Sequence, residues 1–204
     1  MKTFLVFDTE TTGLPADYNA PMGRLDNWPR VIQLSFIHFD EFGNDIMSYN
    51  ALVKPDGWEM PVGKFWIDNG FSQAKSMREG LPIDIVIDEF IERINNSDVL
   101  VAHNIKFDYN IIGAEMIRLG KKANKRLPQV CTMLQSVDFC KIPGKMGFKW
   151  PKLPELHSKL FGRGFSGAHD AMCDTMATKS CFIELCKREI IPGFTSFNQH
   201  MNNI

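Results

Sequence analysis

The fold is decided by a short run near the N-terminus that reads TFLVFDTETTGLP and spans residues 3–15. Its first five residues are almost entirely apolar, which is typical of a short strand buried on both faces of a sheet. Two acids, Asp8 and Glu10, follow at the end of this strand, before a glycine and a proline stop it. Because side chains alternate along a strand, the two carboxylates point to the same side.

Such a pair of carboxylates at the edge of a core has a specific chemical requirement. The two groups repel each other, so they need either protonation or a cation. Hard oxygen ligands suit Mg²⁺ or Mn²⁺. The alternative is that Asp8 and Glu10 only cap the turn at the strand end.

Outward from this run, the chain alternates between strand and helix patterns. We expect strands at 31–40, 46–53 and 99–102, and helices at 83–95, 107–119, 153–161 and 168–190. Residues 16–30 and 141–152 have the composition of loops, 58–80 are a short helix and a loop, and 130–139 are a short strand or helix. Early strands followed by alternating helices and strands predict an α/β domain with a mixed sheet.

Two further acids follow apolar elements. Asp108 closes the segment HNIKFD (103–108) and lies in the first turn of a helix, where the helix dipole alone would favour it. The segment HDAMCD (169–174) places His169 at the entry of a helix and Asp174 inside it. Since the neighbours of Asp174 are apolar, it is a poor core residue and a better metal ligand.

Taken together, three segments resemble the sequence motifs of the DEDDh 3′→5′ exonucleases, in order and in spacing. They are FDTETTGLP (7–15), HNIKFD (103–108) and HDAMCD (169–174). That superfamily includes the epsilon subunit of bacterial DNA polymerase III and RNase T, and the resemblance covers residues 2–185. It implies the ribonuclease H-like fold, an α/β architecture with a mixed five- or six-stranded sheet flanked by helices. It also implies a two-metal-ion hydrolysis of nucleotides from the 3′ end of DNA or RNA.

The resemblance assigns a role to each polar residue of the motifs. Asp8, Glu10 and Asp174 would hold one of two divalent cations, Mg²⁺ or Mn²⁺, and Asp8 would bridge to the second, which Asp108 supports. His169 would be the general base that takes a proton from the attacking water. The sister subfamily has a tyrosine four residues before the last aspartate, where this chain has an aspartate.

The same resemblance suggests contacts to the substrate. Thr11 and Leu14 would meet the last sugar and base, and Asn104 would brace the site by hydrogen bonding, unless it is a buried turn asparagine. An aromatic cluster lies where relatives place residues that wedge between the last bases, although such clusters are more often core: Phe65, Trp66 and Phe71.

The whole chain sets further limits. Its 204 residues fit a single exonuclease domain, with a core at about 2–191 and a short C-terminal tail. The 23 basic and 24 acidic residues argue against tight non-specific binding of duplex DNA, but allow an enzyme that holds a strand end through metal ions. We see no membrane span and no signal peptide, so we expect a cytoplasmic protein without a membrane partner.

Several alternatives remain open at this point. The substrate would be a nucleic acid 3′ end, most simply of single-stranded DNA, in repair or replication. A polymerase that holds the chain as a proofreading subunit, or a second copy of the chain, could be a partner. The chain could also be a non-catalytic nucleic-acid-binding module. Such relatives of nucleases typically lack one of the metal-ligand residues, whereas this chain has all five polar residues of the motifs. A haloacid-dehalogenase-like phosphatase shares the pattern of an apolar strand before DxDxT, but here Glu10 replaces the second aspartate.

Overall fold

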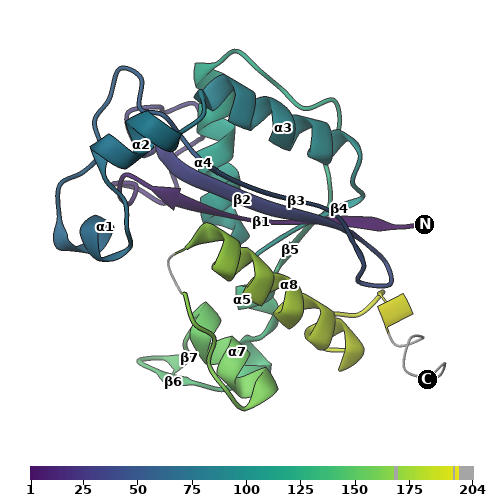
Figure 1. Cartoon of the computed structure of the whole chain (residues 1–204). Helices are drawn as coiled ribbons and strands as arrows, with labels where there is room; N and C mark the ends of the chain where they lie inside the picture. The colour runs from purple at the N-terminus through teal and green to yellow at the C-terminus, as the bar shows by residue number, and fades with distance from the viewer. Residues whose placement is uncertain (168–169, 195, 198–204) are drawn as a thin grey trace.

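The computed structural model describes residues 1–167, 170–194 and 196–197, and a mixed five-stranded sheet forms its centre (Figure 1). The strands lie in the order β3-β2-β1-β4-β5. Pairing is antiparallel between β1 and β2 and between β2 and β3, and parallel between β1 and β4 and between β4 and β5. The strands are β1 (Thr3–Thr11), β2 (Val31–Asp40), β3 (Asp45–Leu52), β4 (Val99–Ala102) and β5 (Gln129–Cys131). The predicted α/β class with a mixed sheet is confirmed.

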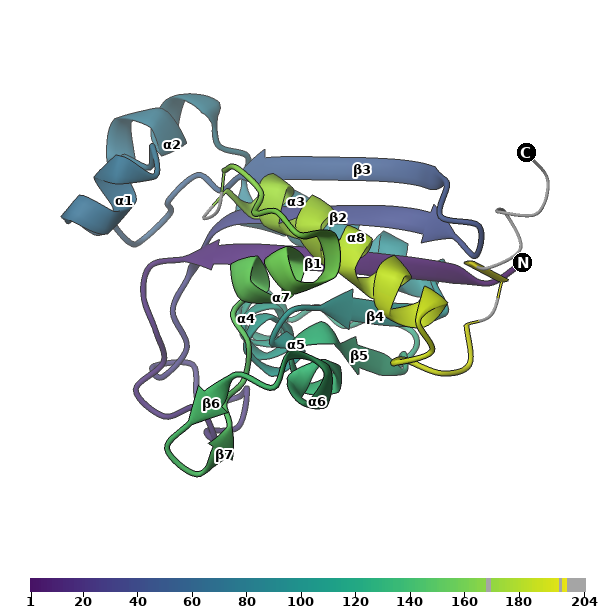
Figure 2. The same ribbon diagram turned by 90° about the horizontal axis from the view of Figure 1, so that it is seen from below.

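Helices cover both faces of this sheet (Figures 1 and 2). On one face lie α3 (Ile83–Asn95) and α4 (Ile105–Arg118), and on the other lie α7 (Leu153–Phe161) and α8 (Ala171–Lys187). Successive side chains of β1 point to opposite faces of the sheet, so this strand packs against both helical layers. Leu5 and Phe7 pack into the cluster with α3 and α4, whereas Phe4 and Val6 pack into the cluster with α7 and α8.

The segments that the sequence left ambiguous contain short elements. Residues 58–80 hold α1 (Lys64–Asp68) and α2 (Gln73–Glu79), one helix more than predicted. Residues 130–139 divide between the end of β5 and the helices α5 (Thr132–Gln135) and α6 (Val137–Cys140). The predicted loop at 141–152 carries a small hairpin of β6 (Pro143–Gly144) and β7 (Gly147–Phe148). Two-residue strands are too short to leave a periodic pattern in the sequence.

The first strand runs to Thr11 and contains both acids, as predicted, and its backbone pairing with β2 continues as far as Val31 past a bulge after Glu10. Two predicted helix starts are wrong. Helix α4 begins two residues earlier than predicted. Helix α8 begins at Ala171, where Asp170 caps it by accepting hydrogen bonds from two backbone N–H groups.

The loop predicted at residues 16–30 is irregular in the structure, and all five cysteines of the chain are free thiols. Within the described residues, no helix has the length and apolar character that a membrane span requires.

Candidate active site

Three of the four predicted acids meet at one end of β1. Asp8, Glu10 and Asp174 each offer a carboxylate oxygen, and these atoms lie within 4.8 Å of one another. Asp8 and Glu10 continue the side of β1 on which Phe4 and Val6 face α8. Asp174 lies in the first turn of α8, so the packing of this helix on the sheet brings it to the same place.

Asp108 reaches this end of β1 from the opposite helical layer. Strand β4 pairs with β1 only as far as Val6, so the edge of β1 beyond that residue is open. Asp108, in the first turn of α4, supplies a hydrogen-bond acceptor to the backbone at this edge. It accepts hydrogen bonds from the backbone N–H of Thr9 at 3.1 Å and from the Thr9 hydroxyl at 2.7 Å. Asp108 is almost fully buried, and its negative charge raises the pKa of both Asp8 and Glu10.

The electrostatics of these acids are those of a cation site. Burial, then Asp108 and the other neighbouring carboxylates, raises the pKa of Asp8 well above its usual range. Burial and the charge of Asp174 raise the pKa of Glu10 to about 8. Burial raises the pKa of Asp108 to about 7, against the two hydrogen bonds from Thr9, which lower it. A divalent cation would relieve this repulsion, and an all-carboxylate donor set suits Mg²⁺ or Mn²⁺.

A glutamine holds the start of α8 in place. The side chain of Gln33 on β2 accepts a hydrogen bond from the backbone N–H of Ala171 at 3.2 Å and donates to Asn50 at 3.0 Å and to Asp170 at 3.4 Å. Gln33 lies opposite Glu10 in the β1–β2 pairing. Sequence reasoning missed this role, although an amide between two apolar residues of a strand, Ile32 and Leu34, was a usable signal.

His169 directly precedes the capping Asp170, and it lies outside the described residues. The residues predicted to contact the substrate have different surroundings. Thr11 is buried at the end of β1, where its hydroxyl donates to the carbonyl of Gly13 at 2.6 Å, and Leu14 is 74% exposed. Asn104 takes a left-handed conformation (φ 69°) at the N-cap of α4 and makes no side-chain capping bond.

The predicted aromatic wedge divides into residues with different surroundings. Phe71 is buried in a small core with Ile32 and Met60, which agrees with the interpretation of this cluster as core. The indole N–H of Trp66 donates to the carbonyl of Thr11 at 3.2 Å, and Phe65 is 45% exposed.

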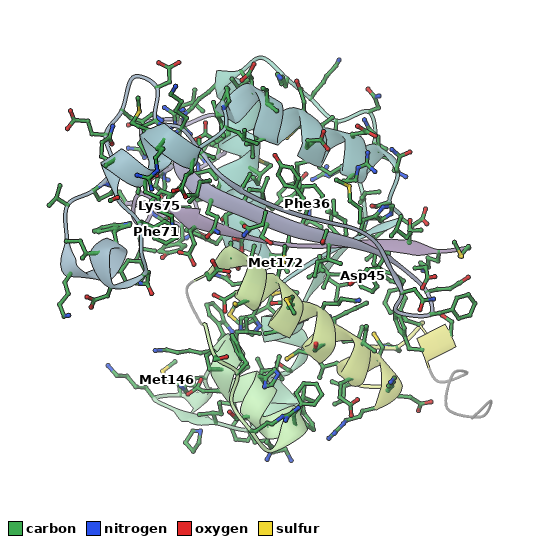
Figure 3. All side chains as sticks on the ribbon, in the orientation of Figure 1. Phe36, Asp45, Phe71, Lys75, Met146 and Met172 are labelled. Atoms are coloured by element: carbon green, nitrogen blue, oxygen red, sulfur yellow. The ribbon has the colours of Figure 1, made fainter. Side chains whose placement is uncertain are left out.

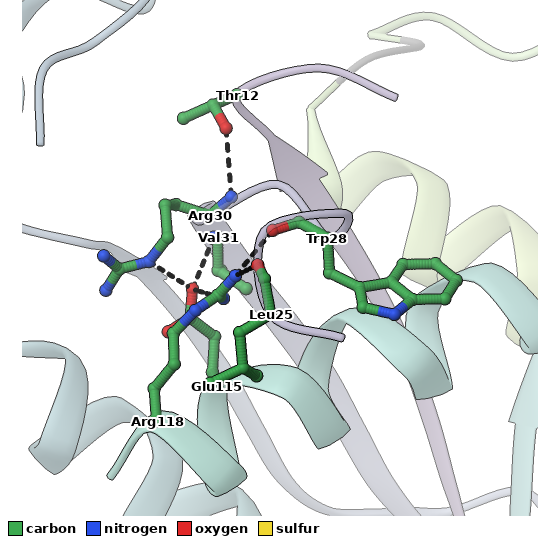
Figure 4. Close-up of polar contacts among 7 residues, drawn as sticks. All are labelled: Thr12, Leu25, Trp28, Arg30, Val31, Glu115 and Arg118. Atoms are coloured by element: carbon green, nitrogen blue, oxygen red, sulfur yellow. Dashed lines mark hydrogen bonds and ion pairs between the residues drawn. The ribbon is translucent and has the colours of Figure 1, made fainter. Parts of the chain in front are cut away.

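A buried charge cluster ties the loop after β1 to α4 (Figure 4). Glu115, which is 1% exposed, pairs with Arg30 at 2.8 Å and with Arg118 at 3.0 Å. Arg118 also donates to the backbone carbonyls of Leu25 and Trp28. The loop that leaves the acidic site is therefore anchored on the helix that carries Asp108. Sequence reasoning missed this cluster, since its members are far apart in the chain.

Comparisons with known proteins identify relatives of this chain. The model of the family RNase_T, described as exonuclease, matches residues 5–182. The DNA polymerase III subunit epsilon of Treponema pallidum is 29% identical over 181 residues, which cover 88% of this chain and 74% of that protein. The PolC-type DNA polymerase III of Streptococcus sanguinis is 32% identical over 118 residues, which cover 58% of this chain but only 7% of the polymerase.

Solved structures share the fold. Exonuclease I of E. coli, crystallised with the oligonucleotide dT13, superimposes with a TM-score of 0.70 and 20% identity, over 92% of this chain and 41% of that one. The complex with dA16 gives a TM-score of 0.70 and 19% identity over 99% of this chain and 43% of that one. This chain thus spans less than half the length of those exonuclease chains.

Proposed function

The chain belongs to the RNase T family of DEDDh 3′→5′ exonucleases, which are phosphodiester hydrolases, and we propose that it removes nucleotides one at a time from the 3′ end of single-stranded DNA. The observation that carries this proposal is the convergence of Asp8, Glu10 and Asp174 at one end of β1, with Asp108 beside them. In this proposal the whole chain, residues 1–204, acts as one exonuclease domain.

The four acids would hold two divalent cations, Mg²⁺ or Mn²⁺. Asp8, Glu10 and Asp174 suit the first position because their oxygens can share one ion. Asp108 would serve the second position, with its orientation set by Thr9. When bound, such cations supply activation of a water molecule and neutralisation of the charge that builds up on the phosphate.

Other side chains would handle the proton and the substrate. His169 would accept the proton of the attacking water, since it stands one residue before the cap of α8 and imidazole titrates near neutral pH. Thr11 and Leu14 would contact the terminal nucleotide, because they lie in the segment that leaves Glu10 and Leu14 offers an exposed apolar side chain. Asn104, whose side chain makes no capping bond to α4, would brace the site by hydrogen bonding.

The choice of DNA is supported by the relatives. One similar protein is a subunit of DNA polymerase III, and the similar exonuclease I structures were solved with dT13 and dA16. The polymerase relatives also favour a second candidate role, in which the same activity proofreads as part of a polymerase. Stimulation of the hydrolysis of a mispaired primer end by an added DNA polymerase, which only the proofreading role predicts, distinguishes the two roles.

The test uses an oligodeoxynucleotide labelled at its 5′ end. With Mg²⁺ we expect a ladder of products that shorten one nucleotide at a time, and no products with EDTA. Asp8→Asn and Asp174→Asn should each abolish the ladder, whereas Asp56→Asn, at an exposed acid in another part of the chain, should retain it. If Asp8→Asn formed these products as fast as the wild type, the assignment of Asp8 to the catalytic metal site would be disproved.

A further inference from the structure

The hairpin segment, residues 141–152, differs in charge from the rest of the chain. It reads KIPGKMGFKWPK and contains four lysines and no acid, in a chain with a net charge of −1. Three large apolar side chains lie among these lysines in the sequence and are exposed: Met146 by 97%, Phe148 by 47% and Trp150 by 64%. The β6–β7 hairpin projects from the body of the molecule (Figure 2), and Met146 lies at its outer side (Figure 3).

Trp150 also forms part of a cleft of about 700 Å³, within the ~300–1,000 Å³ typical of small-molecule sites. Lys106 and Asn19 lie at this cleft, where the Lys106 ammonium donates to the Asn19 side chain at 2.8 Å. The remaining lining is mainly apolar and aromatic and includes Tyr18, Trp28, Ile105, Met133 and Leu134.

The cleft is joined to the candidate active site through the second motif. Asn104 lines the cleft, and it caps the helix whose first turn carries Asp108. His103 fixes the end of the hairpin segment: its Nε2 lies 3.0 Å from the carbonyl of Pro151, and its Nδ1 lies 2.9 Å from the hydroxyl of Thr132. Nε2 must donate to the carbonyl, and burial lowers the pKa of His103 to about 4, so the ring is neutral and its unprotonated Nδ1 faces the Thr132 hydroxyl. This contact holds Trp150 beside the entry of α4.

We propose that the hairpin segment and the cleft beside Trp150 bind the nucleotides that precede the terminal one in a single-stranded substrate. This inference rests on the proposed exonuclease function. Aromatic side chains stack on unpaired bases, and lysines follow the phosphate backbone of a single strand. The bases of a duplex are already stacked and paired, so the same surface selects single strands over blunt duplex ends.

The main test compares an oligonucleotide with a substrate that has no preceding nucleotide. Trp150→Ala should raise the KM for a short single-stranded oligothymidylate by roughly five- to a hundredfold, as expected for the loss of one stacked base. The same variant should hydrolyse the p-nitrophenyl ester of thymidine 5′-phosphate, which has no preceding nucleotide, at the wild-type rate. Trp150→Phe should restore the KM, and Ile46→Ala, at an exposed apolar residue of β3, should match the wild type. An unchanged KM for Trp150→Ala, or an equal loss on both substrates, would overturn the inference.

A second measurement tests the lysines and does not require hydrolysis. Binding of the labelled oligothymidylate is followed by fluorescence anisotropy at several salt concentrations, in an Asp8→Asn background that prevents digestion. Lys145→Ala should reduce the slope of log affinity against log salt by about 0.7, the value for one phosphate contact on a single strand. An unchanged slope counts against the inference. If the wild type hydrolyses neither substrate, the proposed function fails, while this binding measurement still decides the role of the hairpin.

Discussion

Replacement of Thr9 by valine removes a single hydroxyl group next to the acidic site and nearly preserves the shape of the side chain. That hydroxyl donates to Asp108 at 2.7 Å in a buried position, while the backbone N–H of Thr9 keeps its own bond to the same oxygen. A hydrogen bond to a charged group contributes about 1.5–3 kcal/mol. Since one pKa unit corresponds to about 1.4 kcal/mol, the pKa of Asp108 should rise by about 1–2 units.

The consequence is a defect in metal binding that depends on pH. The pKa of Asp108 is already raised to about 7, so about half of this group is ionised at neutral pH. A further rise of about 1–2 units leaves about 1–10% ionised, which lowers the apparent Mn²⁺ affinity about 5- to 50-fold near pH 7. The defect should shrink toward about pH 9, where the carboxyl group ionises in the variant as well.

The assay is a titration of Mn²⁺ by calorimetry across this pH range, together with the single-turnover rate on a labelled oligonucleotide. Thr9→Ser retains the hydroxyl and should behave like the wild type. An affinity for Thr9→Val that equals that of the wild type at every pH would refute the reasoning. A loss of the same size at every pH would also refute it, because that result indicates a displaced Asp108 rather than a shifted pKa.

Three further predictions follow from other contacts. Gln33→Leu should lower kcat about 10- to 100-fold with little change in KM, because it releases the N-terminus of α8 from β2 and misplaces Asp174; an unchanged kcat in steady-state assays would contradict this. Glu115→Gln should destabilise the fold by about 3 kcal/mol in urea denaturation, since it leaves two mostly buried arginines without their counter-charge; a loss below about 1 kcal/mol would contradict the importance of this cluster. The raised pKa of Glu10, about 8 against an ordinary 4.5, stabilises the metal-free fold fully below about pH 4.5, and this contribution is lost as the pH rises to about 8. Thermal melts in EDTA should therefore show a falling Tm over that range, which Mn²⁺ reverses most strongly at the upper end; a Tm that does not depend on pH would contradict it.

The sequence alone determined the fold class and the four acids of the candidate site. The apolar run at residues 3–7 and the stripe of the helix at 83–95 are local patterns, because burial on a strand or a helix repeats every two or every 3.6 residues. The orientation of Asp8 and Glu10 toward one side follows from the same alternation. Asp174 was recognisable because a carboxylate among apolar neighbours needs a partner.

Only the tertiary structure decided which groups support those acids. The Thr9–Asp108 bonds, the contact of Gln33 with the start of α8 and the pairing of Arg30 with Glu115 join residues about 85–140 positions apart. The position of Trp150 beside Asn104 is likewise set by a histidine that reaches across the fold to Pro151. Periodicity records only whether a residue faces the core, whereas the identity of its neighbour is set when the helices pack on the sheet. For this reason the chemistry of the site could be predicted from local patterns, and its positioning contacts could not.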